Sequence, residues 1–355
     1  MKHGVSTLDT MTRHARHGQP ETHPREVNAH ASHGEGVHTH GAHEHGSHNH
    51  AAHDHGSLAD EAAMAEVIEL DASLAGGYAD EAAAWAAELA HGPVRSALDL
   101  GAGTGVGTLA LARRFPEATL TAVDLSPMML RRLRTAMEKS GMGERLRTVE
   151  ADLDAEFDAG WAGAAGAEGG ADLAWASSSL HHVTDPDRVL GSILRTLRPG
   201  GLLLVLELDE LPRFLDGAGD GLATLEDRCH REMDRLGWNS HPEWSDALAG
   251  AGFRLEGRRT LEVEAGGADE ANGSPPSELA RFARLFLSRI RAALSSSQGS
   301  SLDGLAVEED LAALDIADDM AALDRLLGQG PGSLEELPGL SVRTRRTAWA
   351  ARRPV

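Results

Sequence analysis

Short apolar segments alternate with amphipathic segments between residues 94 and 208 of this chain of 355 residues. The alternation is typical of a parallel sheet covered by helices on both faces, because parallel strands need a crossover connection. It predicts strands at 94–100, 118–124, 146–150, 172–176 and 202–208, and helices at 105–114, 127–140 and 186–197. Gly200 and Gly201 are expected to end the last of these helices.

The segments outside this core complete the predicted architecture. Two Ala-rich helices precede it at residues 57–92, and two strand-like segments that start at Phe253 and Ser341 are expected to form an antiparallel edge hairpin. Helical insertions are predicted at 211–245 and 265–335, where apolar stripes at helix spacing favour core packing over ligand binding. The predicted fold is a doubly wound, Rossmann-like α/β domain with a seven-stranded, mostly parallel sheet.

Composition argues against several classes of partner. The formal net charge of -22 argues against a nucleic-acid surface, which needs clustered Lys and Arg. Cys229 is the only cysteine, so no internal disulfide forms and nothing calls for an oxidising compartment. The N-terminus lacks a secretory apolar stretch, and no apolar run reaches membrane-spanning length. We therefore expect a cytoplasmic protein without membrane contact, whose oligomeric state stays open.

Histidine recurs through the first 56 residues, with Gly, Ala and Ser between and almost no large apolar residues. This composition predicts a disordered tail. Neutral imidazoles at this density bind Zn or Ni in overlapping arrangements without one defined geometry. We expect adventitious rather than functional metal binding, through His38, His40, His43, His45, His48, His50, His53 and His55.

The segment ALDLGAGTGVG carries the most specific signal. A buried strand ends there and turns through Gly101, Gly103 and Gly105 into a helix, and glycines permit positive φ and a close approach of backbone to a ligand. A dinucleotide site would need a small residue at position 106, which is Val106. Asp99 beside the turn repels a pyrophosphate and favours a sulfonium and an ammonium group.

Two further acids follow the next two predicted strands. Asp124 ends the second strand, where a carboxylate accepts hydrogen bonds from both ribose hydroxyls. Asp152 follows the third strand and is expected to accept one from an adenine amino group, while Met128 packs on the base.

Taken in order, the segments DLGAGTG, VDLSPMM, EADL, AWASSSLHHV and LRPGGLLLV resemble the motifs of class I S-adenosylmethionine-dependent methyltransferases. The resemblance implies S-adenosylmethionine as cofactor and a small-molecule acceptor. It implies contacts to the methionine moiety from Gly101, Ala102, Gly103 and the backbone of Ser177, to the ribose from Asp124 with Leu125, and to the adenine from Asp152 and Leu153. Residues 93–210 would then bind the cofactor within a domain of residues 57–355, and the N-terminal helices and the insertions would close over the acceptor.

Methyl transfer from a sulfonium is an in-line displacement that rests mainly on alignment, so no catalytic residue is obligatory. For a hydroxyl, an amine or an acidic carbon as acceptor, His181 or His182 is placed to act as base, although a packed loop histidine is the preferred interpretation of either. Arg213, Arg228 and Arg231 are candidates to bind a substrate carboxylate, against the commoner alternative of a solvated face.

Two other functions stay open. One is an NAD(P)-dependent oxidoreductase on a related fold, against which Val106 and Asp99 count. The other is a metal-binding protein that acts through its histidine-rich tail. The three differ in the ligand that stabilises the folded domain: S-adenosylhomocysteine, NAD or a metal ion.

Overall fold

The computed structural model describes residues 58–154, 170–238, 243–266, 276–300 and 316–355. The described residues all belong to one compact unit. The histidine-rich segment, with the metal ligands predicted in it, lies outside the described residues.

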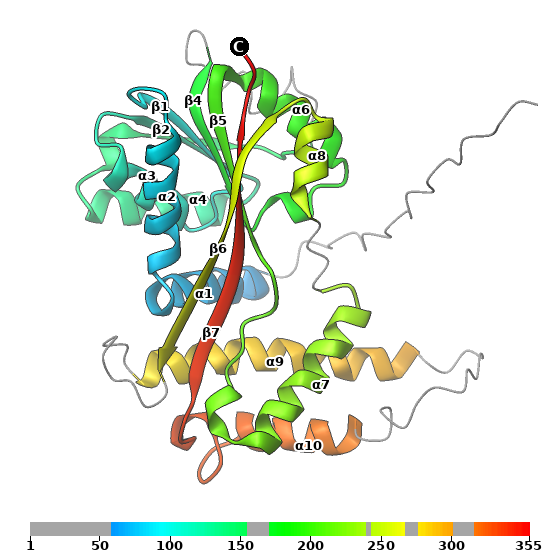
Figure 1. Ribbon diagram of the computed structural model, residues 1–355. Coiled ribbons are helices and arrows are strands. Elements are labelled where there is room, and N and C mark those ends of the chain that lie inside the picture. Colours follow the sequence, from blue (N-terminus) through cyan, green and yellow to red (C-terminus); the bar gives the residue numbers. More distant parts are fainter. Residues whose placement is uncertain (1–57, 155–169, 239–242, 267–275, 301–315) are drawn as a thin grey trace, which may run out of the picture. The chain divides into compact units, whose positions relative to one another are not determined.

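Seven strands form one mixed sheet in the order β3-β2-β1-β4-β5-β7-β6 (Figure 1). Strands β1 to β5 pair in parallel, whereas β7 pairs antiparallel with both β5 and β6. The order of β1 to β5 is that of doubly wound α/β folds. The predicted fold class is confirmed, and so is the antiparallel hairpin at the edge. The strands are β1 Ser96–Leu100, β2 Thr119–Asp124, β3 Leu146–Glu150, β4 Ala171–Ser177, β5 Leu197–Leu208, β6 Arg254–Gly266 and β7 Ser341–Arg352.

Helices cover both faces of the sheet. In β5, Leu202, Leu204 and Leu206 share one core with α2 and α3, whereas Leu203 and Val205 share another with α6 and α8. Both faces of β5 are therefore buried, which explains why its sequence is a continuous apolar run. The helices are α1 Leu58–Leu74, α2 Gly77–Leu89, α3 Val106–Arg114, α4 Pro127–Lys139, α6 Pro186–Thr196, α7 Asp220–Arg235, α8 Trp244–Gly250, α9 Pro276–Ser300 and α10 Ile316–Leu327. Short 3-10 turns are η1 Gly143–Arg145, η3 Leu180–His182, η4 Asp216–Ala218 and η7 Leu334–Glu336.

Two helices that follow strands of the core start at a capping residue followed by proline. The Ser126 hydroxyl accepts a hydrogen bond from the Met129 amide at 3.0 Å and begins α4. The Asp185 carboxylate accepts one from the Arg188 amide at 3.0 Å and begins α6. The cap satisfies an amide that the first turn leaves unpaired, and proline at the first position has no amide to satisfy.

The sequence predicted that Gly200 and Gly201 end helix α6, and this prediction is wrong. The helix stops at Thr196, and both glycines lie inside β5. Gly200 adopts a φ of +78°, and a Cβ on Gly201 would lie 3.0 Å from the Ala171 carbonyl oxygen. The two glycines therefore allow the backbone conformation and close packing at the start of β5, where the register of its pairing with β4 shifts.

A second core lies beyond the end of β5, among α1, α7, α9, α10 and the outer halves of β6 and β7, which we call the helical lobe. Figure 1 shows β6 and β7 running from the sheet to α9. Leu279, Phe282, Phe286 and Ile290 of α9 are buried in this core, and so is Leu323 of α10. The apolar stripes predicted in this part of the chain are thus core positions, apart from Val307, Leu311 and Leu314, which lie outside the described residues.

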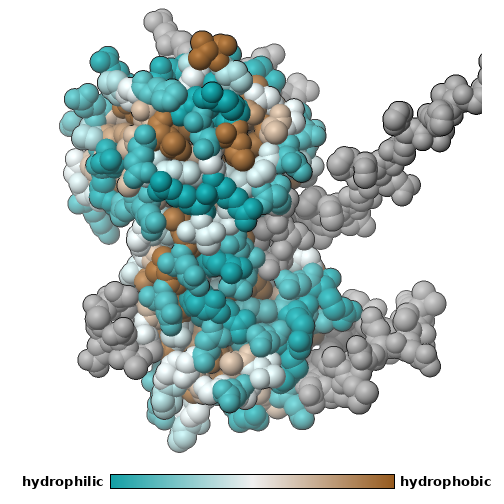
Figure 2. All heavy atoms as spheres, in the orientation of Figure 1, coloured by the Kyte–Doolittle hydropathy of each residue, from teal (hydrophilic) through white to brown (hydrophobic). Residues whose placement is uncertain are grey.

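Hydrophilic residues predominate on the face that Figure 2 shows, over both the sheet and the lobe. Within the described ranges, no helix combines the length and the apolar character that crossing a bilayer requires.

Candidate functional site

The glycine turn between β1 and α3 has two kinds of glycine. Gly101, Gly103 and Gly105 all adopt positive φ angles, of +68°, +53° and +97°. A Cβ on Gly101 would overlap Ser179 Cβ, and one on Gly105 would lie 2.7 Å from Leu133, so protein packing requires these two glycines. A Cβ on Gly103 would meet only the tip of Ile68, at 3.7 Å. The turn therefore keeps its backbone accessible at Gly103.

Asp124 holds this turn from the end of β2. Its Oδ2 accepts a hydrogen bond from the Gly103 amide at 2.8 Å, and its Oδ1 accepts one from the Ser126 amide at 2.8 Å. Burial raises the pKa of this carboxyl, and the two amide hydrogen bonds oppose the shift. A carboxylate accepts about four hydrogen bonds, so Asp124 retains lone pairs for the hydroxyls of a ligand.

Asp99 is placed differently from the other acids of the site. Its side chain is buried against the first turns of α3, where Oδ2 accepts a hydrogen bond from the Thr108 hydroxyl at 2.6 Å. Burial raises the pKa of Asp99 to about 7, the Thr108 hydrogen bond opposes this shift, and the nearby Asp124 adds to it. A negative charge on Asp99 is therefore costly near neutral pH, and its structural role here is to tie β1 to α3.

The residues predicted to contact a nucleoside line the carboxyl edge of the sheet after β2 and β3. Leu125 is 48% exposed although it is a large apolar residue, and Met128 and Leu153 are half-buried. Asp152 is exposed, and its Oδ1 accepts a hydrogen bond from the Asp154 amide at 2.8 Å. Accessible apolar side chains beside two acids suit a base that stacks and a sugar that donates hydrogen bonds.

The end of β4 bends sharply next to the glycine turn. Ser178 follows Ser177 with a φ of +50°, and among the described residues it is the only non-glycine with a positive φ. The Ser179 hydroxyl then donates a hydrogen bond to the Leu100 carbonyl oxygen at 2.8 Å. This contact fixes the β4 loop to the glycine turn, and nothing in the sequence pattern had indicated it.

The two histidines after β4 have unequal surroundings. His181 Nδ1 lies 2.7 Å from Glu207 Oε2, and Glu207 is fully buried near the end of β5. His182 is exposed, and its ring lies against that of His181 with centroids 3.9 Å apart. The sequence had treated the two histidines as equivalent, and it had not selected Glu207, which is hidden in the apolar run LLLVLEL.

Helix α1 connects this edge with the helical lobe. Its Ile68 approaches Gly103, its Glu61 accepts a short hydrogen bond from the Ser126 hydroxyl, and its Glu69 pairs with Arg132 at 2.9 Å. On the opposite side its Val67 and Leu70 are buried in the lobe core.

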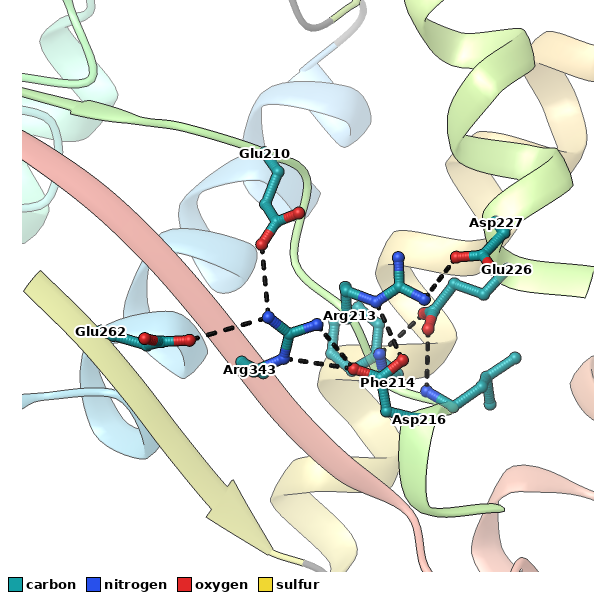
Figure 3. Close-up of polar contacts among 9 residues, drawn as sticks. Glu210, Arg213, Phe214, Asp216, Glu226, Asp227, Glu262 and Arg343 are labelled. Atoms are coloured by element: carbon teal, nitrogen blue, oxygen red, sulfur yellow. Dashed lines mark hydrogen bonds and ion pairs between the residues drawn. The ribbon is translucent and has the colours of Figure 1, made fainter. Parts of the chain in front are cut away.

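The three arginines proposed for a substrate carboxylate are not gathered at one point. Arg228 forms a two-point ion pair with Asp319 of α10, with contacts of 2.5 and 2.9 Å. Arg213 pairs with Asp216 at 2.9 Å and with Asp227 at 2.6 Å, beside Arg343, which pairs with Asp216 at 2.8 Å (Figure 3). These cations are matched by carboxylates of the chain itself.

Arg213 and Arg231 line a cavity of about 280 Å³ between α7 and the segment that follows β5. His230, nine-tenths buried, also lines this cavity, and its Nε2 has no hydrogen-bond partner among the described residues. Burial lowers the pKa of His230 to about 4, and the Arg213 charge adds to the shift, so the ring is neutral at pH 7. The remaining lining residues are Glu210, Leu211, Asp227 and Asp234.

Residues 97–201, which hold the glycine turn, Asp124 and the β4 loop, match the family model described as a methyltransferase domain. This part of the chain is thus similar to a methyltransferase domain. This domain is 35% identical over 163 residues to a malonyl-[acyl-carrier protein] O-methyltransferase of Laribacter hongkongensis, a match that covers 46% of this chain and 52% of the relative. It is also 35% identical over 119 residues to a trans-aconitate 2-methyltransferase of an Azoarcus species, with 34% of this chain and 40% of the relative covered.

The chain thus spans about half the length, or less, of these curated relatives. Among solved structures, a putative sarcosine dimethylglycine methyltransferase from Galdieria sulphuraria matches 78% of this chain and 85% of its own, with 16% identity and a TM-score of 0.40.

Proposed function

We propose that this protein transfers a methyl group from S-adenosylmethionine to a small-molecule acceptor. The observation that carries the proposal is the glycine turn whose accessible member, Gly103, has its amide held by Asp124 at 2.8 Å. Gly103 is partly exposed, and a ligand beside it would meet carboxylates rather than free cations, which suits a positively charged nucleoside and not a phosphate.

The chain's residues fit such a nucleoside in three parts. Gly101, Ala102 and Gly103 would contact the methionine moiety together with the backbone of Ser177. Asp124 and Leu125 would hold the ribose, and Asp152, Leu153 and Met128 the adenine. Asp99 would affect the nucleoside only through the turn, from behind it, because its carboxylate is hydrogen-bonded to the Thr108 hydroxyl.

When bound, S-adenosylmethionine supplies a methyl group activated by a positive sulfur. The protein's part is to fix that group, to align the acceptor and to exclude water, each of which lowers the barrier without a covalent step. Helix α1, which contacts both the glycine turn and the lobe core, would form one wall of the reaction site.

The cavity between α7 and the segment after β5 is the place we assign to the acceptor. Its volume of about 280 Å³ lies near the lower end for small-molecule sites. Of the three candidate arginines, Arg231 is the one without a carboxylate partner among the described residues. Arg231 would therefore be the cation available to bind a carboxylate group of the acceptor away from the atom that is methylated.

Calorimetry with S-adenosylhomocysteine and the full chain tests the proposal. Asp124→Asn should weaken binding by roughly 10- to 100-fold, because charge-assisted hydrogen bonds to ribose contribute about 1.5 to 3 kcal/mol. Asp246→Asn on helix α8 is the matched control and should leave the affinity unchanged. Absence of binding to the unaltered chain, or stabilisation by NAD in place of the nucleoside, would refute the proposal.

A further inference from the structure

The most unusual group at the carboxyl edge is Glu207. It is 0% exposed in β5, where it pairs in register with Thr347 of β7, and its Oε1 has no hydrogen-bond partner among the described residues. Burial of an unpaired carboxylate costs several kcal/mol, so such a group persists where another interaction offsets the cost or where function requires it. The hydrogen bond from its Oε2 to His181 Nδ1, at 2.7 Å, is the interaction that the structure shows.

The position of His181 connects this pair to the proposed cofactor site. The η3 turn begins directly after Ser179, whose hydroxyl is hydrogen-bonded to Leu100 and whose Cβ abuts Gly101. Leu180 anchors the turn in the core, and the His181 side chain remains 19% exposed. The imidazole is therefore held by a rigid turn at the edge where the methyl group would be presented.

We propose that Glu207 is a positioning residue that keeps the proton of His181 on Nδ1, so that Nε2 accepts a proton from the methyl acceptor. A carboxylate that accepts from Nδ1–H leaves the lone pair on Nε2, because the hydrogen bond at one ring nitrogen sets the tautomer. The same negative charge stabilises the imidazolium that forms when Nε2 takes a proton. This inference rests on the proposed methyl transfer.

The inference defines a class of acceptor, namely one that carries a hydrogen on the atom to be methylated. A lone pair of oxygen or nitrogen, or the former C–H pair of an acidic carbon, forms the new bond to the methyl carbon. The carbon–sulfur pair remains on sulfur, the X–H bond breaks with its electron pair left on X, and the proton goes to His181 Nε2. Hydroxyls, amines and acidic C–H groups meet this description. A carboxylate does not, because at neutral pH it has no proton to lose.

The Glu207–His181 hydrogen bond also gives the two histidines different surroundings. His181 is hydrogen-bonded to a buried carboxylate and is fixed by Leu180, whereas His182 is exposed and packs against the ring of His181. We therefore assign the proton-accepting role to His181 alone.

The tautomer is measured directly by nitrogen NMR of the full chain labelled with ¹⁵N-histidine, with the His181 signals assigned from their loss in His181→Gln. We expect a protonated Nδ1 and a bare Nε2 at His181. Glu207→Met, which keeps length and apolar contacts, should abolish this preference. Glu207→Gln is the matched control and should preserve it, because an amide oxygen still accepts from Nδ1–H. A bare Nδ1 at His181 in the unaltered chain would overturn the proposal without any variant.

Turnover supplies the second readout, as formation of S-adenosylhomocysteine with phenols, amines, β-dicarbonyl compounds and carboxylic acids as acceptors. For an acceptor that loses a proton, Glu207→Met should lower kcat about 100-fold, in the range expected for loss of a general base. Its affinity for S-adenosylhomocysteine should stay within about 2-fold of the unaltered chain.

The outcomes separate this inference from the proposed function. Failure of the unaltered chain to bind S-adenosylhomocysteine refutes the methyltransferase proposal itself. Binding and turnover of carboxylic acids only, with kcat unchanged in Glu207→Met, retains the methyltransferase and refutes the role of Glu207.

Discussion

The glycine turn and the helical lobe are built by different means. Apart from its contact with Ser179, the turn draws its groups from one stretch between Asp99 and Ser126, and its geometry is held by backbone amides on the Asp124 carboxylate. The lobe is tied by ion pairs between distant segments, such as Arg343 with Asp216 and Arg228 with Asp319. A substitution in the turn should therefore act on backbone geometry, and one in the lobe on side-chain charge.

The two regions also bury an acid each, in different ways. Asp99 behind the turn accepts a hydrogen bond from the Thr108 hydroxyl, whereas Glu226 of α7 accepts two from the Phe214 and Leu215 amides, at 2.7 and 3.0 Å (Figure 3). Burial raises the pKa of both carboxyls to about 7. Glu226 in the lobe therefore binds two backbone amides, whereas Asp99 at the turn connects β1 to helix α3.

The largest effect is expected from Gly101→Ala in the turn. The new Cβ would overlap Ser179 and strain a φ of +68°, so we expect a loss of roughly 4 to 5 kcal/mol in the free energy of unfolding. Gly141→Ala is the matched control, because Gly141 has a φ of +70° but no atoms near its Cβ. Urea denaturation measures both, and equal losses would show that strain alone, not the contact with Ser179, dictates this glycine.

A smaller effect is expected from Asp99→Asn, and it should depend on pH. An acid whose pKa is raised from 3.8 to about 7 on folding contributes stability that is present below pH 4 and is lost as pH rises to about 7. A shift of this size corresponds to about 4 kcal/mol at most. Unfolding of Asp99→Asn between pH 4.5 and 8 should therefore be less dependent on pH than that of the unaltered chain.

Glu226→Gln provides the comparison in the lobe. It removes a similar titration but leaves one acceptor oxygen for two amides, so the variant should be less stable than the unaltered chain at pH 4.5. If Asp99→Asn loses as much stability at that pH as Glu226→Gln does, the two acids do not differ as described.

The smallest effect is expected from Asp319→Asn at the Arg228 pair. The pair is partly exposed, so its loss should lower the free energy of unfolding by about 1 to 2 kcal/mol. The affinity for S-adenosylhomocysteine, measured by calorimetry, should not change, because the pair lies in the lobe between α7 and α10. A change in that affinity would show that the lobe and the turn are coupled.

Local sequence predicted the positions of the strands well, but it predicted poorly which distant residues contact one another. The alternation of apolar segments located β1 to β5, because strand and helix periods are properties of neighbouring residues. Gly200 and Gly201 were misassigned, because a glycine that ends a helix and one that starts a strand look alike in sequence. Glu207 was missed because its partner His181 lies 26 residues away and an apolar run conceals it.

The candidate site divides in the same way. The sequence by itself indicated the turn, because glycines at 101, 103 and 105 permit the positive φ angles that it adopts and because Asp124 is the last residue of the next strand. Only the tertiary structure placed β7 between β5 and β6, laid α1 beside Gly103, matched Arg213 and Arg228 with acids, and brought Glu207 to His181. These contacts join residues that are distant in the chain, and they depend on which surfaces are buried together, a quantity that no local pattern records.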